Sequence, residues 1–274
     1  ASVPPCLRAS LPPCLPAFPR HYHAPMTADT QLALYARDGD VGTLTLNRPD
    51  AHNALSIDLI AALHARADHI ASDPPKVLVL TGAGRSFCAG MDLKQVLSSP
   101  DAPRQLLTSL SRFLLALRAL PSVVIAKVNG AAIGGGCGMT CACDFALTYA
   151  ECKMGFPEVD LGVCPAVVAP WLVRKVGTGR AREILLRGGT FTGQRALELG
   201  LVSELAPREG LDAAVAALAA KIASGGALAL AKTKGLLNEL DGSLDESLAL
   251  RAADLSAQVL ATEEAQAALR ARLT

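Results

Sequence analysis

Two apolar runs, each followed by a glycine-rich loop, decide the fold of this chain. The first is Lys76-Val-Leu-Val-Leu-Thr-Gly82, which leads into Phe87-Cys-Ala-Gly-Met-Asp92. The second is Val123-Val-Ile-Ala-Lys-Val-Asn-Gly130, which leads into Gly134-Gly-Gly-Cys-Gly138. A short β-branched run that ends in glycines predicts a strand that turns sharply into the start of a helix.

The two loops are suited to binding an oxygen atom that carries negative charge. Glycine lets the backbone approach a ligand without a side chain in between, and the first N–H groups of a helix have no partner within it. If each loop directs one N–H group at the same oxygen, the pair forms an oxyanion hole. Glu158, in Gly155-Phe-Pro-Glu-Val-Asp-Leu-Gly162, then supplies a carboxylate for proton transfer. Partial burial is expected to raise its pKa toward neutrality.

Simpler structural roles exist for the same residues. A glycine loop can be a tight packing turn, and a carboxylate at the first turn of a helix can serve only to complement the helix dipole. We expect Asp92 to cap a helix, Asp144 to anchor a strand through hydrogen bonds, and Asp160 to be a solvated or structural charge. Two loops together with one carboxylate favour a functional site over these alternatives.

Neither loop matches a nucleotide-binding motif. The dinucleotide fingerprint G-x-G-x-x-G needs a third glycine where this chain has Met139 or Phe87. The phosphate loop G-x-x-x-x-G-K-[ST] and the nucleophile elbow G-x-S-x-G do not occur. Cys88 is not expected to be a nucleophile, because no histidine–acid pair lies at a suggestive spacing.

The composition indicates one large globular domain with an aliphatic core. Of 274 residues, 51% are hydrophobic and only 4% are aromatic. The net charge of +1 implies no strong field for nucleic acid or a membrane surface. No apolar stretch has the length and purity of a membrane span. We therefore expect neither nucleic acid nor a membrane as a partner.

The cysteines are scattered and do not predict a disulfide scaffold or a metal site. There are 8 of them, and we interpret them as reduced thiols in an intracellular protein. Cys137, Cys141 and Cys143 lie close together but lack the paired C-x-x-C spacing of a zinc site and have no histidine nearby in the sequence. Small buried hydrophobic residues are the expected role.

The order of elements predicts an α/β fold with a helical C-terminal third. Residues 1–25 are rich in proline and contain no acidic residue, so we expect a tail outside the fold. Residues 32–37 and 41–46 predict a hairpin around Asp38-Gly-Asp40. Further strands are expected at residues 76–81, 123–128, 144–149 and 202–205. Helices are expected at residues 56–71, 103–120, 133–143, 165–176, 179–187, 193–199, 209–224, 227–239, 243–258 and 262–272.

Several of these stretches resemble the crotonase family, also called the enoyl-CoA hydratase/isomerase superfamily. The resemblance runs in order from about residue 31 to the C-terminus. It is carried by Leu46-Asn-Arg-Pro, Val79-Leu-Thr-Gly, Phe87-Cys-Ala-Gly-Met-Asp-Leu, Val128-Asn-Gly with Gly134-Gly-Gly-Cys, Cys143-Asp, Phe156-Pro-Glu with Leu161-Gly, and Phe191-Thr-Gly with Ala196-Leu-Glu-Leu-Gly-Leu-Val. The closest branch is similar to methylglutaconyl-CoA and isohexenylglutaconyl-CoA hydratases, through Gly138 and the segment Pro165–Pro170.

The resemblance implies a spiral of ββα turns with the acyl-CoA site at residues 26–224, and a helical trimerisation region at residues 225–274. It implies an acyl-CoA thioester as substrate, a homotrimer or dimer of trimers, and no metal or redox cofactor, since CoA is part of the substrate. The implied location is the cytoplasm of a bacterium, or the mitochondrial matrix of a eukaryote. Glu158 is then the catalytic acid–base group, and the N–H groups of Met91 and Gly135 form the oxyanion hole. The implied substrate- and CoA-binding residues are Ala89, Gly90, Asp92, Gly134 and Gly138.

The chain departs from the best-known hydratases at one position. They carry two glutamates, and Gly138 stands where the first is found. Three alternatives follow from the resemblance. The protein hydrates a 2-enoyl-CoA with Glu158 alone, it is a Δ3,Δ2-enoyl-CoA isomerase that needs only one base, or it binds acyl-CoA without turnover. We place hydration first.

Overall fold

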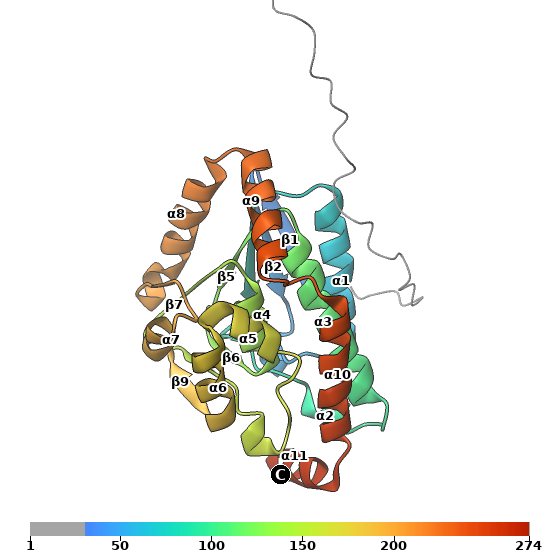
Figure 1. The fold of residues 1–274 in the computed structure, drawn as a ribbon. Coiled ribbons are helices and arrows are strands. Elements are labelled where there is room, and N and C mark those ends of the chain that lie inside the picture. The colour runs from blue at the N-terminus through green and yellow to red at the C-terminus, as the bar shows by residue number, and fades with distance from the viewer. Residues whose placement is uncertain (1–30, 274) are drawn as a thin grey trace, which may run out of the picture.

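The computed structural model describes residues 31–273, which form two β-sheets surrounded by helices (Figure 1). The larger sheet has six strands in the order β1-β2-β3-β5-β7-β10, and the smaller has four in the order β4-β6-β8-β9. The expected tail at residues 1–25 lies outside the described residues. The strands are β1 (Ala33–Asp38), β2 (Val41–Leu46), β3 (Val77–Gly82), β4 (Ser86–Cys88), β5 (Val123–Lys127), β6 (Ala131–Ile133), β7 (Phe145–Thr148), β8 (Lys153–Gly155), β9 (Thr190–Thr192) and β10 (Glu204–Leu205).

The helices follow the predicted order closely. Most predicted bounds are confirmed within three residues. The helix expected from residue 165 begins only at Ala169, because residues 166–168 form a turn. The α-helices are α1 (Ile57–Ser72), α2 (Leu93–Val96), α3 (Ala102–Ala119), α4 (Gly135–Ala142), α5 (Ala169–Val176), α6 (Thr178–Arg187), α7 (Gly193–Leu199), α8 (Leu211–Ala223), α9 (Ala227–Leu240), α10 (Glu246–Leu260) and α11 (Glu263–Leu273). Short 3₁₀ helices are η1 (Pro49–Ala51), η2 (Val159–Leu161) and η3 (Arg208–Gly210).

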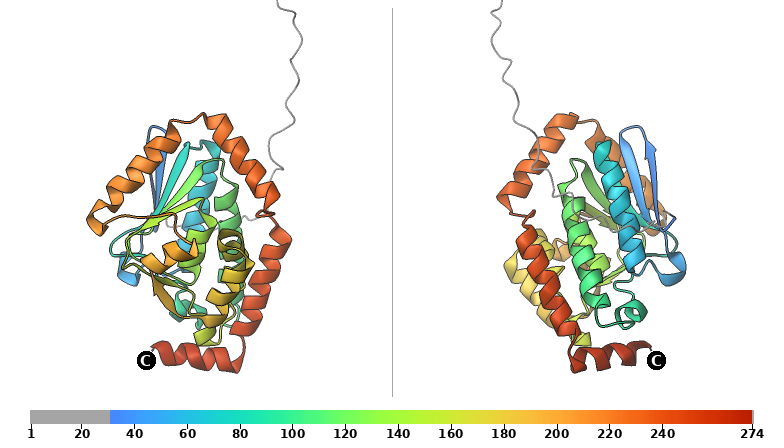
Figure 2. Two further views of the ribbon diagram at one scale, coloured as in Figure 1. Left: turned by 60° about the vertical axis from the view of Figure 1, so that its left-hand side comes forward. Right: turned by 90° about the vertical axis from the view of Figure 1, so that its right-hand side faces the viewer.

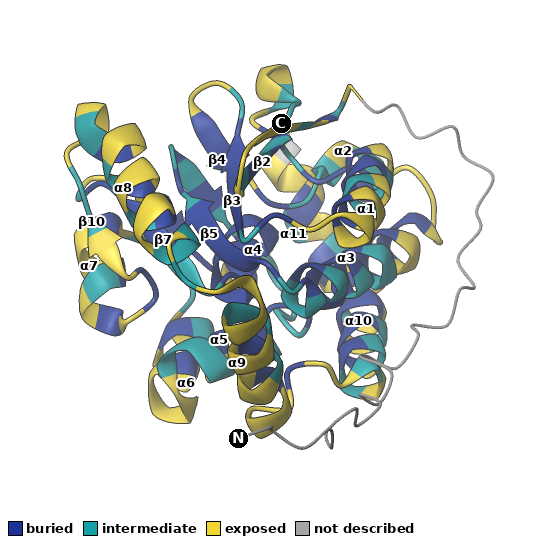
Figure 3. Ribbon diagram, turned by 90° about the horizontal axis from the view of Figure 1, so that it is seen from above, coloured by how far each residue is buried: buried dark blue, intermediate teal, exposed yellow. Residues whose placement is uncertain are grey.

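The larger sheet begins with the predicted hairpin and continues with parallel strands. β1 and β2 pair antiparallel around Gly39, whose φ of +55° suits glycine. β2 then pairs parallel with β3, with Leu44 opposite Leu80, and β3 pairs parallel with β5. Every residue of β3 is buried, as expected for a strand covered on both faces. Figure 3 shows β3, β5 and α4 at the buried centre of the molecule.

From β3 to β8, successive strands alternate between the two sheets, which produces the expected spiral. β3, β5 and β7 belong to the larger sheet, and the strands that directly follow them, β4, β6 and β8, belong to the smaller one. Helices follow each strand pair along the chain. The α/β fold with repeated ββα turns is thereby confirmed.

The smaller sheet was not predicted as a set of strands, and this is a correction. Its strands have only three residues each, too few for an alternating pattern to be recognised in sequence. One consequence is that the helix expected at residues 133–143 is shorter. Residues Ala131–Ile133 form β6, and the helix α4 begins at Gly135.

The C-terminal helices run along the outside of the molecule (Figure 2). α10 packs against α3, and α9 presents an inverted pattern in which Lys234 and Asn238 are buried while Leu228 and Leu240 are 70% and 75% exposed. Among residues 31–273, no single helix is long and apolar enough to cross a membrane; residues 208–223 and α9 reach that length jointly, with a bend of 101° between them.

Asp144 connects α9 to the sheet, as its predicted anchoring role requires. Its carboxylate accepts a hydrogen bond from the Val124 N–H at 2.7 Å and forms ion pairs with Lys234 at 2.9 Å and Arg118 at 3.2 Å. Lys234 also donates to the Ser122 carbonyl at 2.8 Å. Since buried ions are stable only when paired and hydrogen-bonded, this cluster determines where α9 attaches.

Candidate active site

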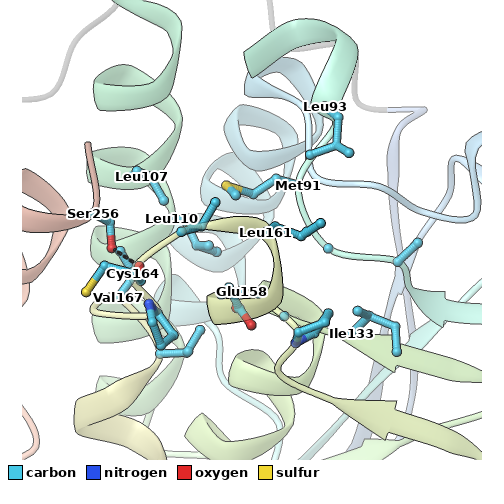
Figure 4. A pocket seen from close by; sticks show the side chains of 18 of the residues that line it. Met91, Leu93, Leu107, Leu110, Ile133, Glu158, Leu161, Cys164, Val167 and Ser256 are labelled. Atoms are coloured by element: carbon cyan, nitrogen blue, oxygen red, sulfur yellow. Dashed lines mark hydrogen bonds between the residues drawn. The ribbon is translucent and has the colours of Figure 1, made fainter. Parts of the chain in front are cut away.

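A cavity of about 190 Å³ lies where the glycine-rich loops, the turn that carries Glu158 and the C-terminal helices meet. Most of its wall is hydrocarbon, and Figure 4 shows Glu158 among the side chains of Leu110, Ile133 and Leu161. The lining residues are Ala89, Gly90, Met91, Leu93, Leu107, Leu110, Ile133, Gly134, Gly135, Pro157, Glu158, Leu161, Val163, Cys164, Pro165, Val167, Val168, Ser256 and Arg272.

Glu158 is the carboxylate in this lining, and it is 9% exposed. Its backbone carbonyl accepts hydrogen bonds from the N–H groups of Leu161 at 3.0 Å and Val163 at 2.8 Å, which close the turn around η2. Within the described residues, its Oε2 atom has no hydrogen-bond partner. Burial, with a smaller contribution from the charge of Asp160, raises the pKa of Glu158 to about 7. Such a carboxyl group can both donate and accept a proton near neutral pH.

The first glycine-rich loop holds the Met91 N–H group in place from both sides. The Leu55 N–H donates to the Gly90 carbonyl at 2.7 Å, and the Asp92 N–H donates to the Leu55 carbonyl at 3.0 Å. These bonds form a parallel bridge between Leu55 and Met91 in which the Met91 N–H itself donates to no described residue. The loop therefore leaves the predicted donor available beside the cavity.

The second loop places Gly135 at the first position of α4. Gly134 has a φ of +53°, its N–H donates to the Gly155 carbonyl at 2.8 Å, and its carbonyl accepts from the Gly138 N–H at 2.9 Å. The Gly138 bond is the first i→i−4 bond of the helix, so the Gly135 N–H precedes the helical ladder and has no partner within it. Met91 and Gly135 line the same cavity as Glu158, which is the grouping that the sequence predicted.

Glycine suits both positions beside the carboxylate, Gly134 through its positive φ and both residues through the limited space around them. A Cβ atom on Gly134 would lie 3.0 Å from Oε1 of Glu158. A Cβ atom on Gly135 would lie 2.9 Å from the Leu55 side chain. Side chains at these positions would crowd the carboxylate or Leu55.

Two of the predicted binding residues, Asp92 and Gly138, are not among the residues that line the cavity. Asp92 caps α2 through bonds from the Lys94 and Gln95 N–H groups at 3.1 and 3.2 Å, and it pairs with Arg48 at 2.7 Å. It therefore positions the Met91 loop from outside the cavity. Gly138 is buried within α4 and is covered by Val168.

Sequence reasoning missed the part of the wall that comes from distant segments. Cys164 and Val168 lie on the turn before α5, Ser256 lies on α10, and the exposed Arg272 lies on α11. The Ser256 hydroxyl donates to the Cys164 carbonyl at 2.8 Å and joins α10 to the wall. Val168 belongs to the segment Pro165–Pro170 that carries part of the resemblance, but no local motif marks Cys164, Ser256 or Arg272, because only tertiary packing brings them to the site.

The cysteines in the described part of the chain are free. Cys88, Cys137, Cys141, Cys143 and Cys152 are buried, and Cys164 is partly exposed. Burial raises the pKa of the Cys88 thiol to about 12, so a thiolate nucleophile is disfavoured there. Asp160 accepts a hydrogen bond from the Gly189 N–H at 2.8 Å, which confirms its expected structural role.

The raised pKa of Glu158 predicts a pH-dependent stability. Between about pH 4.5 and pH 7 the folded state retains a proton that the unfolded state has lost, so stability falls as pH rises through this window. A shift from 4.5 to about 7 corresponds to about 3 kcal/mol. Urea unfolding of the wild type and of Glu158→Gln at about pH 5 and about pH 8 measures the free energy of unfolding and its dependence on pH. From the lower to the higher pH, the free energy of unfolding of the variant should rise by about 3 kcal/mol relative to that of the wild type. If the two proteins show the same pH dependence, the raised pKa of Glu158 is contradicted.

Comparison with known proteins places this geometry in a family. Residues 36–271 match the family model for enoyl-CoA hydratase/isomerase. A crotonyl-CoA hydratase of Syntrophomonas wolfei is 33% identical over 222 residues, which are 79% of this chain and 85% of that protein. A 2,3-dehydroadipyl-CoA hydratase of Escherichia coli is 34% identical over 208 residues, which are 75% of this chain and 81% of that protein.

Solved structures agree with the sequence match. The crystal structure of an enoyl-CoA hydratase/isomerase from Mycobacterium paratuberculosis superimposes with a TM-score of 0.80 at 28% identity. The match covers 88% of this chain and 98% of that one. With its fold, its two glycine-rich loops and its buried glutamate, this chain belongs to the enoyl-CoA hydratase/isomerase family.

Proposed function

We propose that this protein adds water across the double bond of a 2-enoyl-CoA thioester, with Glu158 as its acid–base group. The observation that carries the proposal is that one apolar cavity brings together three groups. They are a buried carboxyl group with a pKa of about 7 and the N–H groups of Met91 and Gly135, neither of which has a partner among residues 31–273. This set can stabilise an enolate and transfer one proton, which is what the reaction demands.

In the proposed reaction the thioester carbonyl oxygen accepts hydrogen bonds from the Met91 and Gly135 N–H groups. Water forms a bond to Cβ, and the electron pair of the double bond moves toward the carbonyl oxygen as an enolate. Protonated Glu158 then gives its proton to Cα, and the proton released by the water returns to the carboxylate. Losing one such oxyanion donor typically costs about 3 kcal/mol of barrier. The reaction requires no metal or redox cofactor, since CoA enters as part of the substrate.

A second candidate is Δ3,Δ2-enoyl-CoA isomerisation, favoured by the single carboxylate in the cavity lining. Ionised Glu158 would remove a Cα proton from a 3-enoyl-CoA, and the resulting dienolate would take the proton back at Cγ. A non-catalytic acyl-CoA-binding role is disfavoured, because an ionisable group buried in hydrocarbon reduces stability without benefiting binding.

More specifically, we propose a substrate of the methylglutaconyl-CoA kind, whose acyl group carries a free carboxylate in addition to the thioester. Arg272 is the arginine among the residues that line the cavity. Guanidinium groups bind carboxylates in a bidentate manner. Within the described residues no ion pair of Arg272 is found. We place the anionic end of the acyl group beside it.

The direction of the pH dependence distinguishes the two reactions. Hydration uses the protonated form of Glu158, so its kcat/KM should fall as pH rises through about 7, whereas isomerisation uses the ionised form and should rise. Rates with 2-enoyl- and 3-enoyl-CoA substrates from about pH 5 to about pH 9 measure this. Glu158→Gln should lose about 10²- to 10⁴-fold in kcat.

Asp160→Asn is the matched control, since it removes an exposed carboxylate from the same turn. It should keep turnover, with the pH dependence moved to slightly lower pH because the Asp160 charge contributes to the raised pKa of Glu158. Full activity of Glu158→Gln would contradict the proposed role.

We further propose that the chain assembles as a homotrimer, or a dimer of trimers, through its C-terminal helices. The exposed leucines of α9 are Leu228, Leu236, Leu237 and Leu240, while the buried side chains of this helix are polar. An apolar face of this kind on the outside of a molecule is typical of a protein–protein contact.

The assembly is tested by sedimentation of the wild type and of Leu237→Lys/Leu240→Lys. The wild type should sediment as a trimer or hexamer, and the variant should dissociate because charge is introduced into the apolar contact. Leu186→Lys, at a leucine on α6 that is 71% exposed, is the control and should not change the assembly. A wild-type monomer at micromolar concentration would reject the proposal.

A further inference from the structure

Val168 fills the space above Gly138, on the side of α4 that faces the cavity wall. A Cβ atom on Gly138 would lie 2.3 Å from Cγ1 and 2.9 Å from Cβ of Val168, but 3.7 Å from its Cα. The first two distances are too short for a carbon–carbon contact, and the third is ordinary. Any side chain at position 138 is therefore excluded by the side chain of Val168 and not by the backbone.

Val168 is held firmly where it stands. It is 3% exposed, its N–H donates to the Pro165 carbonyl at 3.3 Å, and its carbonyl accepts from the Leu172 N–H at 3.1 Å as α5 begins. A β-branched side chain also has few alternative rotamers. Val168 therefore cannot readily turn away from Gly138.

Position 138 is directed toward the cavity by the geometry of α4. Residues 135 and 138 are three apart in the helix and lie on neighbouring parts of one face, and Gly135 lines the cavity. Val168 lines the same cavity, whereas Gly138 does not. Val168 thus separates position 138 from the substrate space and covers that part of the wall with methyl groups.

We propose that Val168 determines the reaction specificity of this site by keeping the wall above Gly138 free of any group that can bind water. The inference rests on the proposed acyl-CoA function and adds a specificity-determining residue to it. Val168 itself offers no group that can hold water near the acyl Cβ, so in this part of the wall Glu158 or a polar group of the substrate must do so. Acyl groups without such a polar group, as in crotonyl-CoA, should be hydrated slowly.

The contact itself is tested by thermal unfolding of Gly138→Ala, Val168→Gly and the double variant. Alanine normally stabilises a helix relative to glycine. In the wild-type background it should instead lower the Tm by about 5 °C through overpacking. In the Val168→Gly background, Gly138→Ala should instead raise the Tm, because the clashing side chain is absent. Equal effects in both backgrounds would overturn the inference, whether or not the protein hydrates any substrate.

The effect on the reaction is tested with Val168→Thr, which keeps the branched shape of the side chain and replaces one methyl group by a hydroxyl group. Its kcat for crotonyl-CoA hydration should rise by about tenfold, because the hydroxyl can hold the attacking water. Val173→Thr, at a partly exposed valine of α5 that does not line the cavity, is the matched control and should show no such gain. An unchanged rate in Val168→Thr would reduce Val168 to a structural residue.

A second variant restores a carboxylate. Gly138→Glu/Val168→Gly should hydrate crotonyl-CoA at least about tenfold faster than Val168→Gly, and Gly138→Gln/Val168→Gly should show no such gain. Gly138→Glu/Val168→Ala should be less stable than Gly138→Glu/Val168→Gly, since alanine keeps the Cβ atom that lies 2.9 Å from a Cβ at position 138. If the glutamate and glutamine variants hydrate equally, the inference is wrong. Hydration that appears only in the glutamate variant would support it even if the wild type proved to be an isomerase.

Discussion

One carboxylate buried in a hydrocarbon wall is the constraint on which the site depends. Glu158 has lost most of its hydration, and its Oε2 atom has no partner in the described part of the chain. Its charge is therefore costly, and the proton stays on until about neutral pH. The glycines at 134 and 135 and the hydrogen-bonded turn around η2 keep this group close to the N–H groups of Met91 and Gly135, which have no partner among the residues that the structure describes. Proton transfer and enolate stabilisation are thereby placed within one cavity.

The alternation of strands between two sheets explains why these groups converge. Three parallel strands of the larger sheet, β3, β5 and β7, are each followed by a short strand of the smaller one, and β4, β6 and β8 end at the Met91 loop, at Gly134 and just before Glu158. Parallel strands end at the same edge of a sheet. The segments that carry Met91, Gly134 and Glu158 span about seventy residues of sequence. They therefore meet without long connecting loops.

Much of this arrangement could be predicted from the sequence, and the failures have physical reasons. The long apolar strands and the helix after Ser56 carry local signals, and the Ser56 side chain caps that helix by accepting a hydrogen bond from the Leu59 N–H. The three-residue strands carry no periodicity. The contact between Gly138 and Val168 spans distant positions, and neither residue type marks it. Likewise, the leucines of α9 lie outward because Lys234 and Asn238 are buried, a reversal that hydrophobic patterning cannot anticipate.

Following the oxygen of labelled water is the most direct measurement of the chemistry. Crotonyl-CoA, 3-methylglutaconyl-CoA and a 3-enoyl-CoA are offered separately in H₂¹⁸O, and the products are resolved by mass. Entry of label into the acyl chain of a 2-enoyl-CoA, greatest for the dicarboxylic substrate, is the result that the single-carboxylate hydration mechanism predicts. Conversion of the 3-enoyl-CoA at unchanged mass, with no label in either 2-enoyl substrate, would contradict it and assign the enzyme to isomerisation.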